Sequence, residues 1–265
     1  MMKIKQIRNA TLRIEYGGQK FLIDPWLAGD EVRFRFVDIP GMPFHTPDPT
    51  KERLPMPLYP LPEPTEKILS SVDHYLVTHI HPDHIDMSPF GKVGAPLDKA
   101  VPILAQNEVD AEVFEQSGFQ NITILSDAGL KIGDVEIIKT PARHGTVVPC
   151  GDACGVIFRA AAEKTLYIAG DTIWYDGVQQ TLEKFCPDVV VLNACAAETV
   201  ENGRLIMNDE DVACVAKAAP GAKLVLSHFD NVAHATITRY KMRGLMASRG
   251  LDGYFLPADG ETIEF

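Results

Sequence analysis

A dense run of metal-binding side chains lies in the first half of the chain. The segment His-Ile-His-Pro-Asp-His supplies four candidate ligands, His79, His81, Asp83 and His84. Neutral imidazole nitrogens and carboxylate oxygens are suitable ligands for zinc and similar divalent ions. His79 and His81 are two residues apart at the end of an expected strand, so their rings should point to the same side. The proline then turns the chain, so that the Asp-His pair can face a neighbouring position. The loop therefore predicts one pair of ligands for each of two metal ions.

Three further candidate ligands occur later in the chain. His144, Asp171 and His228 each stand just after an expected strand, where loops converge. Gly170 allows close backbone approach before Asp171, and this carboxylate could bridge two ions. A lone histidine is more often structural than a ligand. Three such residues at strand ends, beside the histidine-rich loop, favour a metal site instead.

The elements that must position these residues begin as strands and then alternate with helices. Period-two and apolar patterns predict strands at residues 4–7, 11–16, 20–23, 75–78, 102–105, 121–125, 135–140, 155–160, 165–169, 188–192, 222–227 and 254–256. Helical patterns occur at residues 107–117, 174–185, 208–219 and 235–248. This order predicts mixed sheets covered by helices. Because no linker stands out, we expect one domain over residues 1–265.

One segment fits neither pattern. Nine of the nineteen prolines lie between residues 40 and 64, among aromatic and other apolar residues. Proline fixes φ and lacks an N–H, so a helix or a central strand is not expected there. The segment is too apolar for a free linker. We therefore expect an ordered excursion at about residues 29–66 that shapes a substrate pocket.

Composition narrows the class of protein. No apolar run approaches the roughly 20 residues of a membrane helix, and the N-terminus lacks signal-peptide features. The five cysteines form no CxxC pair, and Cys150 and Cys154 are more consistent with an ordinary buried or loop pair than with half of a metal site. The net charge of -11 argues against nucleic-acid binding. We expect a cytoplasmic protein with a small-molecule substrate and no membrane or nucleic-acid partner; a homo-oligomer is compatible with these features.

The ordered set of ligands resembles that of the metallo-β-lactamase superfamily. The match runs from His79 through the Gly170-Asp171-Thr172 segment to His228. The resemblance implies an α+β fold, an αββα sandwich of two mixed β-sheets flanked by helices. It also implies an assignment of the ligands: His79, His81 and His144 would hold the first metal, and Asp83, His84 and His228 the second, with Asp171 between them.

The flanking sequence resembles one branch of that superfamily. Residues 9–25 are similar to the opening of the subgroup that contains the L-ascorbate-6-phosphate lactonases. Asp24 would then orient the site from behind the ligands, while a strand-end turn formed with Pro25 is an equally good interpretation. Many members of that branch carry histidine where this chain has Asn9.

These residues predict a metal-dependent hydrolase. Two divalent ions, zinc best and manganese or iron as alternatives, would provide a metal-bound hydroxide that attacks a carbonyl or phosphorus centre. Asp83 could also orient the nucleophile. Arg143 and His234 are candidates to touch a small, anionic substrate, such as a lactone, a phosphodiester or a phosphorylated sugar derivative. Arg33 and Arg35 could do so too, although half-exposed strand positions explain them better.

Two other functions use the same fold. A nuclease is disfavoured because the chain is acidic and has no basic tract. A non-haem iron oxidoreductase stays open, because mononuclear iron oxygenases of the superfamily have similar ligands. Redox diiron members usually replace the second histidine of the loop with a carboxylate, whereas His81 is present here.

Overall fold

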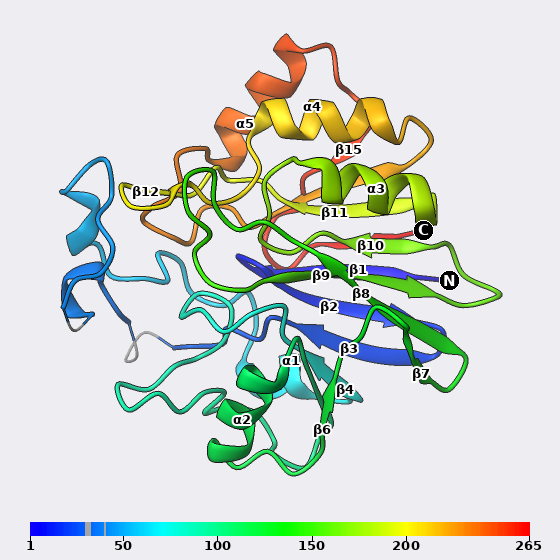
Figure 1. Ribbon diagram of the computed structural model, residues 1–265, viewed down its shortest axis with the longest axis horizontal. Coiled ribbons are helices and arrows are strands. Elements are labelled where there is room, and N and C mark those ends of the chain that lie inside the picture. Colours follow the sequence, from blue (N-terminus) through cyan, green and yellow to red (C-terminus); the bar gives the residue numbers. More distant parts are fainter. Residues whose placement is uncertain (30–32, 40) are drawn as a thin grey trace.

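The computed structural model describes residues 1–29, 33–39 and 41–265, and most of its strands form two seven-stranded sheets (Figure 1). The first sheet has the order β16-β1-β2-β3-β4-β5-β6. Its strands are β1 (Lys3–Arg8), β2 (Thr11–Tyr16), β3 (Gln19–Ile23), β4 (His74–Leu76), β5 (Ile103–Ala105), β6 (Ile122–Ile124) and β16 (Thr262–Glu264). Pairing is antiparallel from β16 to β3 and parallel from β3 to β6, so the sheet is mixed.

The second sheet is also mixed and has the order β15-β14-β11-β10-β9-β8-β7. Its strands are β7 (Leu130–Ile132), β8 (Val135–Pro141), β9 (Cys154–Arg159), β10 (Leu166–Ile168), β11 (Val189–Asn193), β14 (Lys223–Ser227) and β15 (Tyr254–Phe255). Pairing is parallel from β15 to β10 and antiparallel from β10 to β7. A separate small hairpin joins β12 (Glu198–Thr199) to β13 (Gly203–Arg204).

Helices cover the outer faces of both sheets (Figure 1). The first sheet carries α1 (Thr65–Leu69) and α2 (Glu108–Gln116), and the second carries α3 (Asp176–Phe185), α4 (Asp209–Ala218) and α5 (Arg239–Ser248). Side chains of Asn107, Asn208 and Thr238 accept hydrogen bonds from the first turns of α2, α4 and α5 and so fix where these helices begin. The predicted αββα sandwich is confirmed.

Three hydrophobic clusters fill the spaces between these layers. The central cluster joins side chains of both sheets, such as Ile14 and Val191. A second cluster lies between the second sheet and α3–α5, and a third between the first sheet and α1–α2. In β11 the side chains alternate, so that Val189 and Val191 contribute to the central cluster and Val190 and Leu192 to the helical one. A strand buried on both faces explains the unbroken apolar run at this position.

Several predicted boundaries differ from the structure, and two of them lie close to candidate site residues. β4 ends at Leu76, so His79 and His81 lie in a loop rather than at the end of a strand. The chain leaves the sheet because the N–H of Thr78 donates to the Asp24 carboxylate (2.7 Å). Helix α5 begins at Arg239 instead of residue 235, because the N–H groups of Thr236 and Ile237 bond to the Cys195 carbonyl (3.1 and 3.0 Å).

The proline-rich excursion is packed against the protein where the structure describes it; residues 30–32 and 40 of the predicted span 29–66 lie outside the described residues. Phe34 and Met56 form a two-residue antiparallel bridge, and Met56 is fully buried. Beyond it, the Leu58 N–H donates to the Asn231 carbonyl (3.0 Å) in the loop after β14. Short 3-10 turns, η1 (Phe36–Asp38) and η2 (Lys51–Arg53), are its regular elements. In Figure 1 it is the blue coil at the left, next to β12.

The helices are short throughout the part of the chain that the structure describes. None of them is long and apolar enough to cross a membrane.

Candidate metal centre

Loops at one end of the two sheets bring the predicted ligands together. His79, His81, Asp83 and His84 follow β4, His144 follows β8, Asp171 follows β10 and His228 follows β14. Three overlapping groups of these side chains each place their ligand atoms within 4.8 Å of one another. All seven residues predicted as ligands belong to at least one group. Side chains more than 140 positions apart in sequence therefore share one small volume (His84 and His228, |i−j| = 144).

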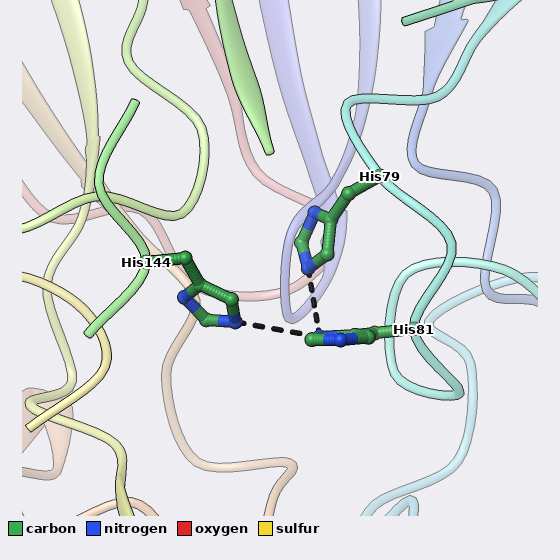
Figure 2. A group of neighbouring side chains, drawn as sticks. All are labelled: His79, His81 and His144. Carbon is green, nitrogen blue, oxygen red and sulfur yellow. Dashed lines mark hydrogen bonds between the residues drawn. The ribbon is translucent and has the colours of Figure 1, made fainter. Parts of the chain in front are cut away.

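The first group consists of His79, His81 and His144 (Figure 2). The Nδ1 atom of His81 lies 3.0 Å from Nε2 of His79 and 3.3 Å from Nε2 of His144. Figure 2 shows His79 and His81 on one loop and His144 on another, with the His144 ring facing the other two across the group. His81 is the most exposed of the three rings, so the group is reached from solvent on its side.

The second group consists of Asp83, His84 and His228. Nε2 of His228 lies 3.2 Å from Nε2 of His84 and 3.3 Å from Oδ2 of Asp83. All three side chains are buried.

Asp171 lies between the two groups. Its Oδ2 is 3.2 Å from Nε2 of His84, 3.7 Å from Nε2 of His144 and 3.9 Å from Nε2 of His79. Its Oδ1 is 3.9 Å from Nε2 of His228. One carboxylate thus faces histidines of both groups, which is the arrangement expected of a bridging ligand.

The donor set fits divalent cations. Pairs of ring nitrogens face each other at 3.0–3.3 Å, and two neutral nitrogens in such a pair compete for the same space unless one carries a proton or both bind a cation. Five imidazoles and two carboxylates, almost entirely buried, match the nitrogen and oxygen ligands of zinc, manganese or iron.

Electrostatics divide the histidines into two kinds. Burial lowers the pKa of His81 to about 3 and also lowers that of His79, with the neighbouring histidines adding to the effect. Burial opposes a charge on His84 as well, but the carboxylates of Asp171 and Asp24 prevail and raise its pKa to about 10. The pKa of Asp171 is well below its usual range, since the nearby histidines outweigh the effect of burial. A positive charge is therefore favoured on His84 beside the two carboxylates, whereas His79 and His81 are neutral near pH 7, the form of imidazole that binds a metal ion.

Asp24 holds the ligand loop from behind. Its Oδ2 lies 2.9 Å from Nδ1 of His84 and accepts a hydrogen bond from the Thr78 hydroxyl (2.8 Å). Both hydrogen bonds are buried, and they leave Nε2 of His84 free to face the centre. A carboxylate on the far nitrogen of a ligand histidine fixes its ring orientation and tautomer. Asp24 also forms the strand-end turn, since its carbonyl accepts from the Trp26 N–H (2.8 Å), so both predicted contacts of this residue are present and its orienting role stays a prediction.

Other ligands are held by residues that the sequence did not single out. The Asn193 amide donates to Oδ1 of Asp171 (2.7 Å), and the Leu205 carbonyl lies 3.2 Å from Nδ1 of His144. The Cys195 thiol lies 3.5 Å from Nδ1 of His228. Asn193 ends the apolar run of β11, so a polar residue at a strand end was the one signal that could have identified it.

Asn9 is also part of the centre. Its side-chain amide donates to the Asp83 carbonyl (3.0 Å) and lies 3.3 Å from Oδ2 of Asp83. Its carbonyl accepts from the His228 N–H (3.0 Å). Both Asn9 and His228 have left-handed backbone (φ 52° and 68°), a conformation that non-glycine residues adopt mainly where the surroundings impose it.

The residues predicted to contact substrate differ in their burial and in their contacts. Arg143 has an exposed side chain that donates to the Thr146 carbonyl (3.4 Å), so it does not join the ligand cluster. Arg35 forms an exposed ion pair with Asp38 (2.7 Å), which fits a surface role. His234 is buried, and its pKa is influenced by charges of the centre. All five cysteines are free, and Cys150 and Cys154 are both buried.

Comparison with known proteins assigns the family. Residues 19–229 match the model of the beta-lactamase superfamily domain. The UPF0173 protein YddR of Bacillus subtilis is 36% identical over 269 residues, which cover 100% of both chains. The chain therefore belongs to the metallo-β-lactamase superfamily.

Two further relatives indicate the kind of activity. A UPF0173 metal-dependent hydrolase of Pyrobaculum arsenaticum is 30% identical over 194 residues, covering 72% of this chain and 71% of the relative. The crystal structure of isothiocyanate hydrolase from Delia radicum gut bacteria is similar at 36% identity and a TM-score of 0.88, covering 99% of each chain. The chain is a metal-dependent hydrolase of this fold. The likeness to ascorbate-6-phosphate lactonases stays a prediction.

Proposed function

We propose that this protein uses two metal ions to hydrolyse a small, uncharged electrophile. Isothiocyanates are the first substrate class to test. The observation that carries the dinuclear part is Asp171, whose two carboxylate oxygens face histidines of both ligand groups at 3.2–3.9 Å. Two ions held this way, zinc by preference and manganese or iron as alternatives, would supply Lewis acidity and lower the pKa of water toward neutrality.

The protein's own residues orient the reactants. Asp24 and Asn193 fix His84 and Asp171, so the ligand atoms are set before substrate arrives. Asp83 acts as a ligand and also orients the attacking water by accepting its hydrogen bond. His81, the most exposed of the first group, borders the side from which substrate enters.

The choice of an uncharged substrate rests on one comparison. A relative at 36% identity, similar over 99% of each chain, is an isothiocyanate hydrolase, and the isothiocyanate group carries no charge. Water adds to the central carbon of R–N=C=S, and cleavage of its C–N bond releases the amine R–NH2 and carbonyl sulfide.

A substrate panel with metal analysis tests this function. Protein purified without added metal is assayed for bound zinc, manganese and iron, and then offered benzyl isothiocyanate, γ-butyrolactone and bis(p-nitrophenyl) phosphate. We expect two ions per chain and release of benzylamine, and we expect His79→Ala to abolish turnover.

Other results would redirect the assignment. Turnover of only the lactone or the phosphodiester would replace the isothiocyanate class and favour the corresponding substrates, including phosphorylated sugar derivatives. Tightly bound iron with oxygen-dependent turnover would favour the non-haem iron oxidoreductase. A single bound ion in the active protein would contradict the dinuclear site.

A further inference from the structure

His234 is a buried histidine with one ring nitrogen, Nδ1, that has no hydrogen-bond partner among the described residues. Its side chain is only 9% exposed, and no residue within the described ranges bonds to its Nδ1 atom, which is itself buried. The ring of Phe36 packs edge-on against it, with ring centroids 5.2 Å apart and an interplanar angle of 82°. A buried polar atom without a partner costs free energy, so such atoms are rare unless a ligand or water completes them.

His234 lies in the loop between β14 and α5, six residues after the candidate ligand His228. Burial lowers the pKa of His234 to about 4, and the residues that act on it are Asp83, His228, Asp171 and His144. The side chain is therefore neutral near pH 7. A neutral imidazole offers one N–H donor and one lone pair.

The backbone around His234 is held on two sides. The Glu198 N–H donates to the His234 carbonyl (3.1 Å), and the Ala233 N–H lies 3.1 Å from the Met56 sulfur. The Lys51 ammonium donates to the Ala235 carbonyl (2.9 Å). Both Met56 and Lys51 belong to the proline-rich excursion, as does Phe36. The excursion thus fixes the ring of His234 and the chain that carries it.

We infer that His234 binds the substrate directly, using its unpaired ring nitrogen to hydrogen-bond a polar atom of the electrophile, while Phe36 positions the ring. This inference rests on the proposed function, because it assumes that substrate occupies the space beside the metal ligands. The inference also narrows the class of substrate. A single uncharged hydrogen-bonding group matches the nitrogen or sulfur of an isothiocyanate, or the carbonyl of a lactone, better than a doubly charged phosphate.

Binding of an unreactive analogue tests this role separately from catalysis. N-benzylthiourea keeps the benzyl–N–C=S skeleton, but its central carbon is a poor electrophile because two nitrogen atoms donate electron density to it. Its affinity for the zinc-loaded protein is measured by titration calorimetry. We expect His234→Ala to raise the dissociation constant of N-benzylthiourea by about 10-fold, which is the scale of one lost hydrogen bond. We expect His234→Gln, which retains a donor and an acceptor, to restore part of the affinity, and both variants to keep two zinc ions per chain.

A second histidine provides a matched control. His74 also has a buried, unpartnered Nδ1 and stacks on a phenylalanine, Phe21, with centroids 5.3 Å apart, but it begins β4 at the other end of the strand from the ligand loop. His74→Gln should leave the dissociation constant within twofold of wild type. Phe36→Ala should weaken binding less than His234→Ala, since it removes the positioning ring and leaves the imidazole.

The possible failures are distinguishable. If His234→Ala binds N-benzylthiourea as wild type does and keeps its kcat/KM on benzyl isothiocyanate, the role of His234 is wrong while the hydrolase assignment stands. If wild type binds the analogue through His234 but hydrolyses no member of the panel, the proposed function is wrong and the binding role stands. Loss of zinc from His234→Ala would show that the residue supports the metal ligands, which would overturn a substrate-binding role.

Discussion

At the scale of single residues, the centre depends on pairs of atoms that hold one another in place. Asp171 contacts both ligand groups, and Asn193 holds Asp171 by a buried hydrogen bond of 2.7 Å. Asp24 holds His84 in the same way. The ligands therefore have little freedom before a metal binds, and loss of a supporting residue should appear first as weaker metal binding.

Asp171→Ala should lower the occupancy of both metal sites, because the carboxylate faces histidines of each group. Elemental analysis of the purified variant measures this, with Asp134→Ala as a control that removes an exposed carboxylate from the turn between β7 and β8. Full retention of two ions by Asp171→Ala would show that the bridging assignment is wrong.

Asn193→Ala should weaken metal binding by about 10–100-fold, the usual cost of losing a residue that orients a ligand. Competition with a chromophoric chelator gives the affinity. Asn121→Ala is a suitable control, since that side chain bonds a backbone carbonyl, of Ala100, next to the first sheet's edge strand. An unchanged affinity in Asn193→Ala would mean that packing alone orients Asp171.

At the scale of elements, hydrogen bonds attach the proline-rich excursion to the loops around it. It is attached to the loop after β14 through Asn231, and to the β12–β13 hairpin through His45 and Val200. His45 also contacts Glu201 twice: its N–H donates to Oε2 (3.0 Å), and Nδ1 lies 2.7 Å from Oε1.

The His45–Glu201 contact should respond to pH. The hydrogen bond to Glu201 raises the pKa of His45, and hydrogen bonds from His45 lower the pKa of Glu201. A raised histidine pKa gives stability that is complete below the unfolded value of about 6.5 and is lost as pH rises through the folded value. A lowered glutamate pKa gives stability that is lost as pH falls. The contact should therefore be strongest from about pH 4.5 to 6.5.

Amide protection factors measure this prediction. We expect protection of the His45 amide to fall as pH rises above that window, and we expect the fall to be absent in Glu201→Gln. Because both side chains are exposed, the change should be small. An equal pH response in wild type and variant would assign it to another group.

At the scale of the whole molecule, the buried centre should couple metal binding to folding. Seven ligands from loops after β4, β8, β10 and β14 meet between the sheets' ends, so ions bound there connect parts that are far apart in sequence. A metal present at a thousand times its dissociation constant would stabilise the fold by about 4 kcal/mol.

Removal of metal should accordingly lower the melting temperature. We expect EDTA to reduce Tm by several degrees and added zinc to restore it, as followed by differential scanning calorimetry. The Asp171→Ala variant should respond less to both treatments. A Tm that EDTA leaves unchanged in wild type would indicate that the ligands hold their geometry without ions.

The sequence by itself determined the seven candidate ligands and the layered fold. Both follow from residues that are close together in sequence. His79 to His84 form one short segment, and each strand or helix has its own pattern of apolar residues. His144, Asp171 and His228 were predicted as further ligands because each follows an expected strand, and neighbouring strands in a sheet end at a shared edge. The assignment of each metal role stays a prediction.

Tertiary structure alone decided which side chains surround those ligands. Asn193, Asn9 and Cys195 meet the centre through contacts with residues 22 to 219 positions away, and no local pattern encodes such distances. The same reason separates Arg143 from His234: each stands within six residues of a ligand, but the fold exposes the first and buries the second. Burial depends on what the rest of the chain places nearby, here Phe36 and the excursion.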